Sequence, residues 1–271
     1  MKYITHFATE AEYQTALPTL DLPNVSLVDE LQEVHYHRAL YGGHAGDLVL
    51  FDVAEQQKIL VTAADWNLTT YPTASYPIVG IVAFDETALG LTLVATHDFK
   101  ADGTKSITVH THLKWQNTNF DWGLTKFATA DAAKADLNGK SNTATILAAI
   151  KAYDLSQGTD NITGCIGQGI QAYVTEGTVA GDWYMPACGE AYALYQKKNT
   201  VNATITKLRA ADTSLALELQ DSYFAYNYTS STEDSSSNTY IYNAKYNIPE
   251  TDSKNSTKSD FYTTRAFLRL N

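Results

Sequence analysis

Apolar and polar residues alternate along the chain in short runs that predict a sheet in its first half. Four runs rich in Val, Ile and Leu are separated by turn residues, and they span residues 47–52, 58–62, 78–84 and 91–96. β-Branched side chains favour strands, and runs of this length are short for helices. Residues 106–115 alternate polar and apolar positions, which predicts a strand with one buried and one wet face. A mixed sheet is therefore expected.

Helical spacing appears mainly after this sheet. Three stretches combine a helical pattern with a favourable start, at residues 142–150, 188–195 and 202–208. Asn142 and Asn202 are good capping residues, and Pro186 is suited to the beginning of a helix. We expect these helices to pack against the sheet.

The start of the chain differs from the rest. Residues 7–17 predict a short helix that Pro18 ends, and Gly42 and Gly43 break the apolar run of residues 25–37. We therefore predict an N-terminal segment, residues 1–44, that attaches the protein to its own copies or to a larger assembly. A single larger domain would occupy residues 45–271, within the size that one core supports.

Composition and charge narrow the functional classes. The 271 residues are 44% hydrophobic and 18% charged, with a net charge of −11, which argues against a phosphate backbone as partner. The N-terminus lacks the apolar region of a signal peptide, and no run approaches the roughly 20 apolar residues that span a bilayer. The two cysteines, Cys165 and Cys188, exclude a disulfide framework but leave one bridge open.

Two histidine pairs are candidates for metal binding. His35 and His37, and likewise His110 and His112, would share one strand face, a geometry that suits a metal or a trimer axis. The alternative is solvated or hydrogen-bonded strand histidines. No cysteine or carboxylate cluster stands at ligand spacing beside them, so we predict no metal.

Candidate catalytic groups are equally sparse. Asp131, Asp136, Asp154 and Asp160 raise the question of a carboxylate pair, which glycoside hydrolysis needs at about 5 to 9.5 Å. Their spacing in the sequence does not show which of them lie close together, and most acidic residues are solvated on a protein surface. The sequence holds no nucleophile elbow, phosphate-binding glycine loop or HExxH motif. We predict neither an enzyme nor a cofactor.

Six short segments together resemble a known family. They are Ala45-Gly46-Asp47-Leu48-Val49, residues 76–82, residues 136–143, Gly181-Asp182-Trp183-Tyr184-Met185-Pro186, Ser230-Ser231-Thr232-Glu233 and Arg265-Ala266-Phe267. Their order over residues 45–271 resembles the C-type-lectin-fold ligand-display proteins of gut anaerobes and of their phages, such as crAss-like phages. Met185 and Cys188 depart from the more typical Leu and Ala or Ser, and Tyr226 and Tyr228 stand where a Trp is missing before Ser230.

The resemblance implies an α+β fold and a role in binding. The implied body is a C-type-lectin-like mixed domain, strand-rich with a few short helices, after a short N-terminal extension. It further implies that Trp183 and Tyr184 are core residues, while Arg265 is expected to pack or pair near the last strand. The calcium-dependent sugar triplets of animal lectins do not occur in the sequence. Aromatic stacking and polar loops remain as ways to recognise a glycan.

The tyrosine-rich tail is the predicted ligand surface. Residues 222–271 contain seven of the 18 tyrosines, among many Ser and Asn. Tyrosine with Ser and Asn is the composition of binding loops. The predicted ligand-binding residues are Tyr223, Tyr226, Tyr228, Asn238, Tyr240, Tyr242 and Tyr246. The alternative is a β-hairpin with aromatic cross-strand pairs, which the alternation at residues 240–242 would also allow.

These observations predict a non-enzymatic recognition protein. The expected role is a fibre or decoration component of a phage virion, which would be outside the cell after lysis. The expected partners are its own copies, as a trimer by analogy with fibres, other virion proteins and a host surface glycan or protein. Neither a nucleic acid nor a membrane is an expected partner. A bacterial surface adhesin or glycan-binding protein is the second hypothesis, and a small hydrolase ranks last.

Overall fold

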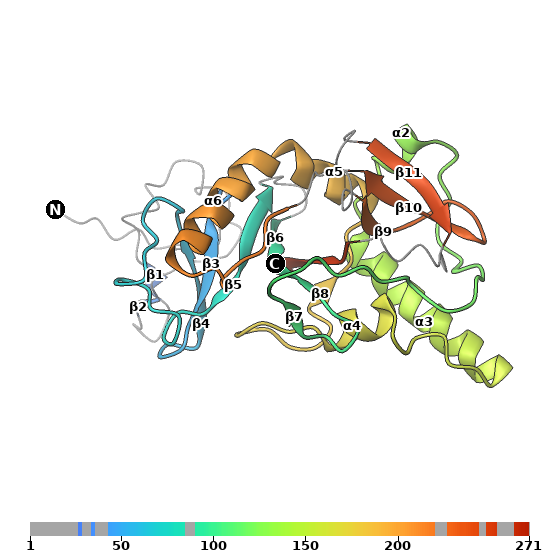
Figure 1. Cartoon of the computed structure of the whole chain (residues 1–271), viewed down its shortest axis with the longest axis horizontal. Helices are drawn as coiled ribbons and strands as arrows, with labels where there is room; N and C mark the ends of the chain where they lie inside the picture. Colours follow the sequence, from blue (N-terminus) through green and yellow to red (C-terminus); the bar gives the residue numbers. More distant parts are fainter. Residues whose placement is uncertain are drawn as a thin grey trace.

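The centre of the molecule is a seven-stranded antiparallel sheet. The computed structural model describes residues 43–84, 90–219, 227–243, 248–253 and 263–270, together with two short paired strands, β1 (Leu27–Val28) and β2 (Val34–His35). The strand order in the sheet is β4-β3-β5-β6-β12-β8, and β7 pairs with the end of β6. The fold is therefore mixed α+β, strand-rich and antiparallel (Figure 1).

The four apolar runs of the sequence form the strands that they predict. These are β3 (Leu48–Asp52), β4 (Gln57–Val61), β5 (Ile78–Phe84) and β6 (Leu91–Phe99). All seven residues of β5 are buried, because helices cover the sheet on both sides. A strand buried on both faces reads as a continuous apolar run.

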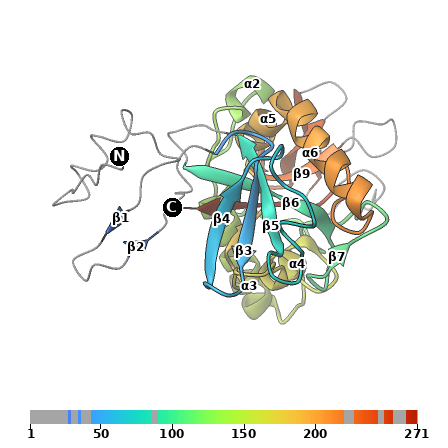
Figure 2. The same cartoon turned by 90° about the vertical axis from the view of Figure 1, so that its left-hand side faces the viewer.

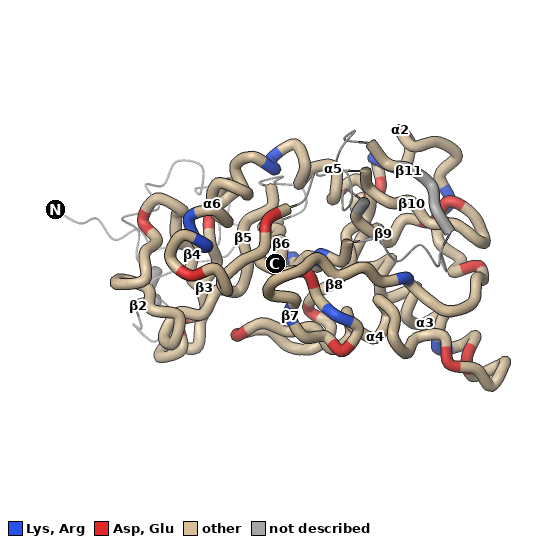
Figure 3. The backbone as a smooth tube through the Cα atoms, viewed as in Figure 1, with Lys and Arg blue, Asp and Glu red and all other residues tan. Residues whose placement is uncertain are grey.

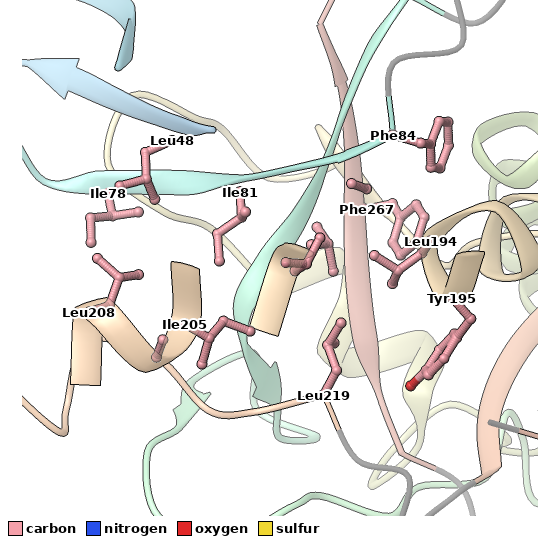
Figure 4. Close-up of a cluster of buried hydrophobic side chains, with 14 of the residues drawn as sticks. Leu48, Ile78, Ile81, Phe84, Leu194, Tyr195, Ile205, Leu208, Leu219 and Phe267 are labelled. Carbon is pink, nitrogen blue, oxygen red and sulfur yellow. The ribbon is translucent and has the colours of Figure 1, made fainter. Parts of the chain in front are cut away.

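Each face of the sheet has its own hydrophobic core, because successive side chains of a strand point to opposite sides. One core joins Leu48, Ile81 and Phe267 to α5 (Cys188–Gln196) and α6 (Lys198–Ala211) (Figure 4). The other joins Val49 and Val82 to α3 (Gly139–Gln157) and α4 (Ile166–Ala172). In Figures 1 and 2 the two helix pairs accordingly lie on opposite sides of the sheet.

The three predicted helices exist, and two of them are longer than predicted. Helix α5 matches its prediction closely, whereas α3 starts before residue 142 and α6 before residue 202. Asn142 does not cap α3; Asn138 occupies that position and Gly158, at φ 65°, ends the helix. Sequence patterns missed α4 because it is short and contains two glycines. A Cβ at Gly169 would lie 2.5 Å from the carbonyl oxygen of Lys100, so only glycine fits there.

The predicted strand at residues 106–115 is wrong. Strand β7 (Lys105–Ser106) ends where that strand was expected to begin. The Ser106 hydroxyl donates to the carbonyl of Val109 at 2.6 Å, which turns the chain away from the sheet. Ile107 and Val109 are consequently 48% and 64% exposed instead of forming a buried face.

A smaller sheet completes the body. It contains β9 (Asn227–Glu233), β10 (Asn238–Asn243) and β11 (Ile248–Ser253) in the order β11-β10-β9. Helix α5 packs against β9 and β10, and the short helix α2 (Ala130–Ala133) contacts β11. The last strand, β12 (Arg265–Leu270), returns to the large sheet and pairs with both β6 and β8 (Trp183–Tyr184).

Some predictions concern residues outside this description. The proposed attachment segment, residues 1–44, and the helix at residues 7–17 lie almost entirely there. Among the described helices, none combines the length and the apolar character needed to cross a bilayer. The question of the cysteine bridge is answered, since Cys165 and Cys188 are both buried and free.

Candidate functional site

The three described tyrosines of the predicted ligand surface are core residues. Tyr228, Tyr240 and Tyr242 are 3%, 2% and 0% exposed, so their rings offer no area to a ligand. Tyr228 and Tyr242 stand opposite each other on β9 and β10, and the Tyr195 ring of α5 contacts both, at centroid distances of 5.4 and 4.8 Å. Tyr228 and Tyr242 therefore form the cross-strand pair of the alternative interpretation, whereas Tyr240 packs with Ala133 and Cys188. The expectation of exposed binding rings was wrong because α5 covers this face of the small sheet.

The other predicted residues have a different status. Asn238 is half-buried at the start of β10, and its backbone N–H donates to the Ser235 hydroxyl at 3.1 Å. It borders the turn at residues 234–237, where Ser236 and Ser237 are exposed. Tyr223, Tyr226 and Tyr246 lie outside the described residues. Among those described, the structure thus gives a ligand access to the β9–β10 turn and not to the tyrosines.

Two motif segments, residues 136–143 and 230–233, meet at the Asp136 carboxylate. Its Oδ1 accepts from the backbone and side-chain nitrogens of Asn138, both at 3.1 Å, and its Oδ2 accepts from Asn142 and from the Thr232 hydroxyl, both at 2.8 Å. The same hydroxyl accepts the backbone N–H of Cys188 at 2.9 Å. These five residues, which we call the Asp136 network, join α3, α5 and β9. Asp136 is therefore a structural carboxylate.

Glu233 fixes a long loop against β9. Its carboxylate is fully buried and accepts the backbone N–H groups of Trp122 and Leu124 at 3.0 and 2.9 Å. The indole N–H of Trp115 donates to the carbonyl of Ser230 at 2.8 Å. Burying a carboxylate is favourable only when such donors replace water. This motif therefore holds the loop at residues 115–124 in place.

Glu190 caps helix α5 from inside the core. Its Oε2 accepts the Ala187 N–H at 2.9 Å, while its Oε1 accepts from the Tyr184 hydroxyl at 3.0 Å and from Arg269 at 2.5 Å. Burial raises the pKa of Glu190 to about 7, against the opposing effects of the Ala187 N–H and of Arg269. The stability that this raised pKa contributes is present below the usual range of the carboxyl and is lost as pH rises through about 7.

A buried ion pair ties the last strand to β6. The Arg265 Nε donates to Asp98 Oδ1 at 2.7 Å, and the other guanidinium nitrogens donate to carbonyls of Ala95, Leu217 and Glu218. Both side chains are at most 2% exposed. The pairing role predicted for Arg265 is confirmed, as is the burial of Trp183 and Tyr184, each 1% exposed.

The described histidines and aspartates of these hypotheses form side-chain hydrogen bonds or, at His112, a backbone bridge, whereas the His35 side chain and His37 lie outside the described residues. His110 Nδ1 lies 2.7 Å from the second Asp98 oxygen, and His112 bridges to the backbone of Thr263. Asp154 accepts the backbone N–H of Asn161, and Asp160 that of Thr163. The fourth aspartate, Asp131, pairs with Lys134 on the surface. No group of three potential metal ligands occurs among the described residues.

The buried cysteines are unsuited to chemistry. Burial raises the pKa of the Cys188 thiol to about 12, and it raises that of Cys165 as well. A thiol is reactive only as the thiolate. Both cysteines therefore act as small core residues.

His97 gives the first testable prediction. It is 2% exposed in β6, and its Nδ1 lies 2.9 Å from the Thr96 hydroxyl. Burial, helped by the positive charges of Arg265 and Lys105, lowers its pKa from 6.5 to about 4. Between pH 6.5 and 4, His97 is therefore protonated in the unfolded chain but neutral in the folded protein. The free energy of unfolding should therefore fall by about 3 kcal/mol between pH 6.5 and 4 because of His97 alone.

The variant His97→Asn isolates this effect. Urea unfolding across this pH range gives the free energy of unfolding of the wild type and of the variant. In the difference between the two, the contributions of Glu190 and the other titrating groups cancel. We expect the wild type to lose stability relative to the variant as the pH falls. A constant difference would mean that His97 is not held neutral by the fold.

A cavity of about 420 Å³ is lined by residues of α6 and of the segments next to β3 and β4, and these elements lie at the opposite end of the molecule from the small sheet in Figure 1. It is open to solvent and is lined by the turn at residues 45–47, the turn at residues 62–64 and one face of α6. Asp47 and Lys207 supply its two charged groups. Sequence reasoning placed Asp47 in a family segment but missed its proximity to Lys207, since no motif connects the two elements.

Comparisons of this chain with protein-family models, with curated proteins and with solved structures give no match. The functional argument accordingly rests on the residues and their contacts.

Proposed function

We propose that this protein is a non-enzymatic recognition protein with a C-type-lectin-like body. The observation that supports it is the Asp136 network, in which segments that carry the family resemblance meet although they are far apart in the sequence. Such buried polar contacts hold a scaffold in one arrangement. Surface turns can then vary without loss of the fold.

The described polar groups suit a scaffold better than an active site. Asp136, Glu190 and Glu233 are buried and engaged by backbone or side-chain donors. Catalysis requires such a group to reach a substrate. By contrast, the β9–β10 turn is polar, exposed and held by two paired strands. We infer that this turn, with Asn238 beside it, contacts the ligand.

The proposed setting is the virion of a phage. The protein would be a head or tail fibre or decoration protein that assembles with its own copies, as a homotrimer, through residues 1–44. The host surface, through a glycan or a protein, is the proposed ligand. A bacterial surface adhesin is the alternative. Mass spectrometry separates the two, because the first would be found in purified phage particles and the second on intact bacterial cells.

The recognition function is tested by binding of the labelled protein to a panel of bacterial strains. We expect strain-selective binding that falls at least about tenfold in Ser237→Arg, since a long charged side chain would occupy the contact surface. The matched control is Ser156→Arg, at an exposed serine near the end of α3. Absence of binding to every strain, or equal binding by both variants, would contradict the proposed contact surface.

A further inference from the structure

The cavity beside α6 has walls that are fixed by hydrogen bonds. The Thr204 hydroxyl donates to the carbonyl of Gly46 at 2.6 Å, and Lys207 Nζ donates to the carbonyls of Ala63 and Ala64 at 2.5 and 2.9 Å. Gly46 has φ 94°, and a Cβ there would lie 2.9 Å from the Thr200 methyl group. Both turns are therefore held at a defined distance from the helix. A preformed cavity of this kind avoids the cost of ordering its walls when a ligand binds.

The groups that face the cavity combine donors and acceptors without excess charge. The Lys207 ammonium has three N–H groups for two carbonyl acceptors, which leaves one for a ligand. Asp47 Oδ2 accepts the His44 N–H at 2.9 Å, and a carboxylate has further acceptor positions. Thr62 and Thr200 also line the cavity, but the Thr62 hydroxyl already donates to the Asp65 carboxylate at 2.8 Å and accepts the Asp65 N–H at 3.2 Å. Acidic and basic residues are also interspersed at this end of the molecule (Figure 3).

We propose that this cavity binds one sugar unit of a glycan. A neutral ligand fits because one ammonium and one carboxylate balance each other. Hydroxyl groups of the ligand can accept from the Lys207 ammonium and donate to the Asp47 carboxylate, and the methyl groups of Ala45, Ala63 and Ala203 can contact the C–H groups of a sugar ring. The volume lies within the roughly 300–1,000 Å³ of small-molecule sites. The inference rests on the proposed recognition function and names a ligand class for it.

The cavity is a second contact, separate from the β9–β10 turn. Figure 1 places α6, β3 and β4 at one end of the molecule and the small sheet at the other. One protein could therefore bind a glycan both in the cavity and at the β9–β10 turn. It could also bind a glycan in the cavity and a different ligand at the turn. Two linked weak contacts bind far more tightly than either does alone.

The test is a nuclear magnetic resonance titration of the full chain with glucose, galactose, mannose, N-acetylglucosamine and rhamnose. Ala203 is exposed on α6, so Ala203→Trp should fill the cavity without disturbing the core. The matched control is Ala152→Trp, at an exposed alanine of α3. We expect at least one sugar to bind with a Kd on the order of 1 mM, about tenfold more weakly in Ala203→Trp and unchanged in Ala152→Trp. Thermal unfolding of both variants checks that they fold.

Two results would overturn the sugar site: no binding of any of the five sugars, or equal binding by Ala203→Trp and the wild type. The strain panel keeps this failure apart from failure of the proposed function. If cell binding is selective and Ala203→Trp leaves both cell and sugar binding intact, recognition stands and the cavity is not the site. If a sugar binds in the cavity but no strain is bound, the cavity stands and host recognition fails.

Discussion

Replacing Asp98 by asparagine should lower the free energy of unfolding by about 3–5 kcal/mol. The substitution keeps the shape of the side chain but removes its charge, so the Arg265 guanidinium would remain buried without a counter-ion. Arg265 is 2% exposed and has no route to solvent without movement of β12. Urea unfolding monitored by circular dichroism measures the loss. We also expect His110 to lose its charged partner, since it shares the same carboxylate.

The control for this prediction is Asp131→Asn. Asp131 also pairs with a basic residue, Lys134 at 2.9 Å, but its side chain is 90% exposed. Water already solvates both partners there, so we expect no measurable change in stability. Equal effects of the two substitutions would show that burial does not determine the contribution of the Asp98 pair.

Replacing Glu233 by alanine should lower the free energy of unfolding by about 3–5 kcal/mol, because one buried and one partly buried backbone N–H group would lose a charged acceptor. Those groups belong to Trp122 and Leu124 in the loop that packs on β9. Trp122 is 3% exposed beside Trp115, at a ring distance of 5.5 Å. Loosening of the loop should therefore shift tryptophan fluorescence to longer wavelength at denaturant concentrations below the unfolding transition.

Glu55→Ala is the matched control, since Glu55 is exposed in the turn between β3 and β4. It should leave both stability and fluorescence unchanged. If Glu233→Ala behaved like this control, the Glu233 carboxylate would not be what holds the loop. A loss of stability without a fluorescence shift would instead place the effect in β9 itself.

The pattern of apolar residues predicted the large sheet well, because a strand that is buried on both faces has an uninterrupted run of apolar residues. Residues 78–84 show this, as no polar residue interrupts them. At residues 106–115 the alternation was misleading. The chain turns away there with a hydrogen bond from the Ser106 hydroxyl to the carbonyl of Val109. The pattern of apolar and polar residues does not predict such a local hydrogen bond.

The tyrosines illustrate a different limit. A tyrosine ring serves equally well as a binding surface and as the contact between a helix and a sheet, so composition alone could not decide between them. Helix α5 decides between them, because it is distant in sequence from Tyr228 and Tyr242 and yet its Tyr195 ring contacts both. The cavity beside α6 could not be predicted from the sequence for a related reason. Its residues come from three separate segments and include no unusual type.

The position of β12 has a consequence for how the chain reaches this fold. Strand β12 lies between β6 and β8, so residues 91–94 of β6 lack a neighbour on that side until residue 270 has left the ribosome. Residues 100–264 are synthesised in the interval, while an apolar strand edge is open to pairing with other chains. Pairing over such a sequence distance is also slow. We therefore expect the newly made chain to depend on chaperones, and a chain that stops before β12 to aggregate.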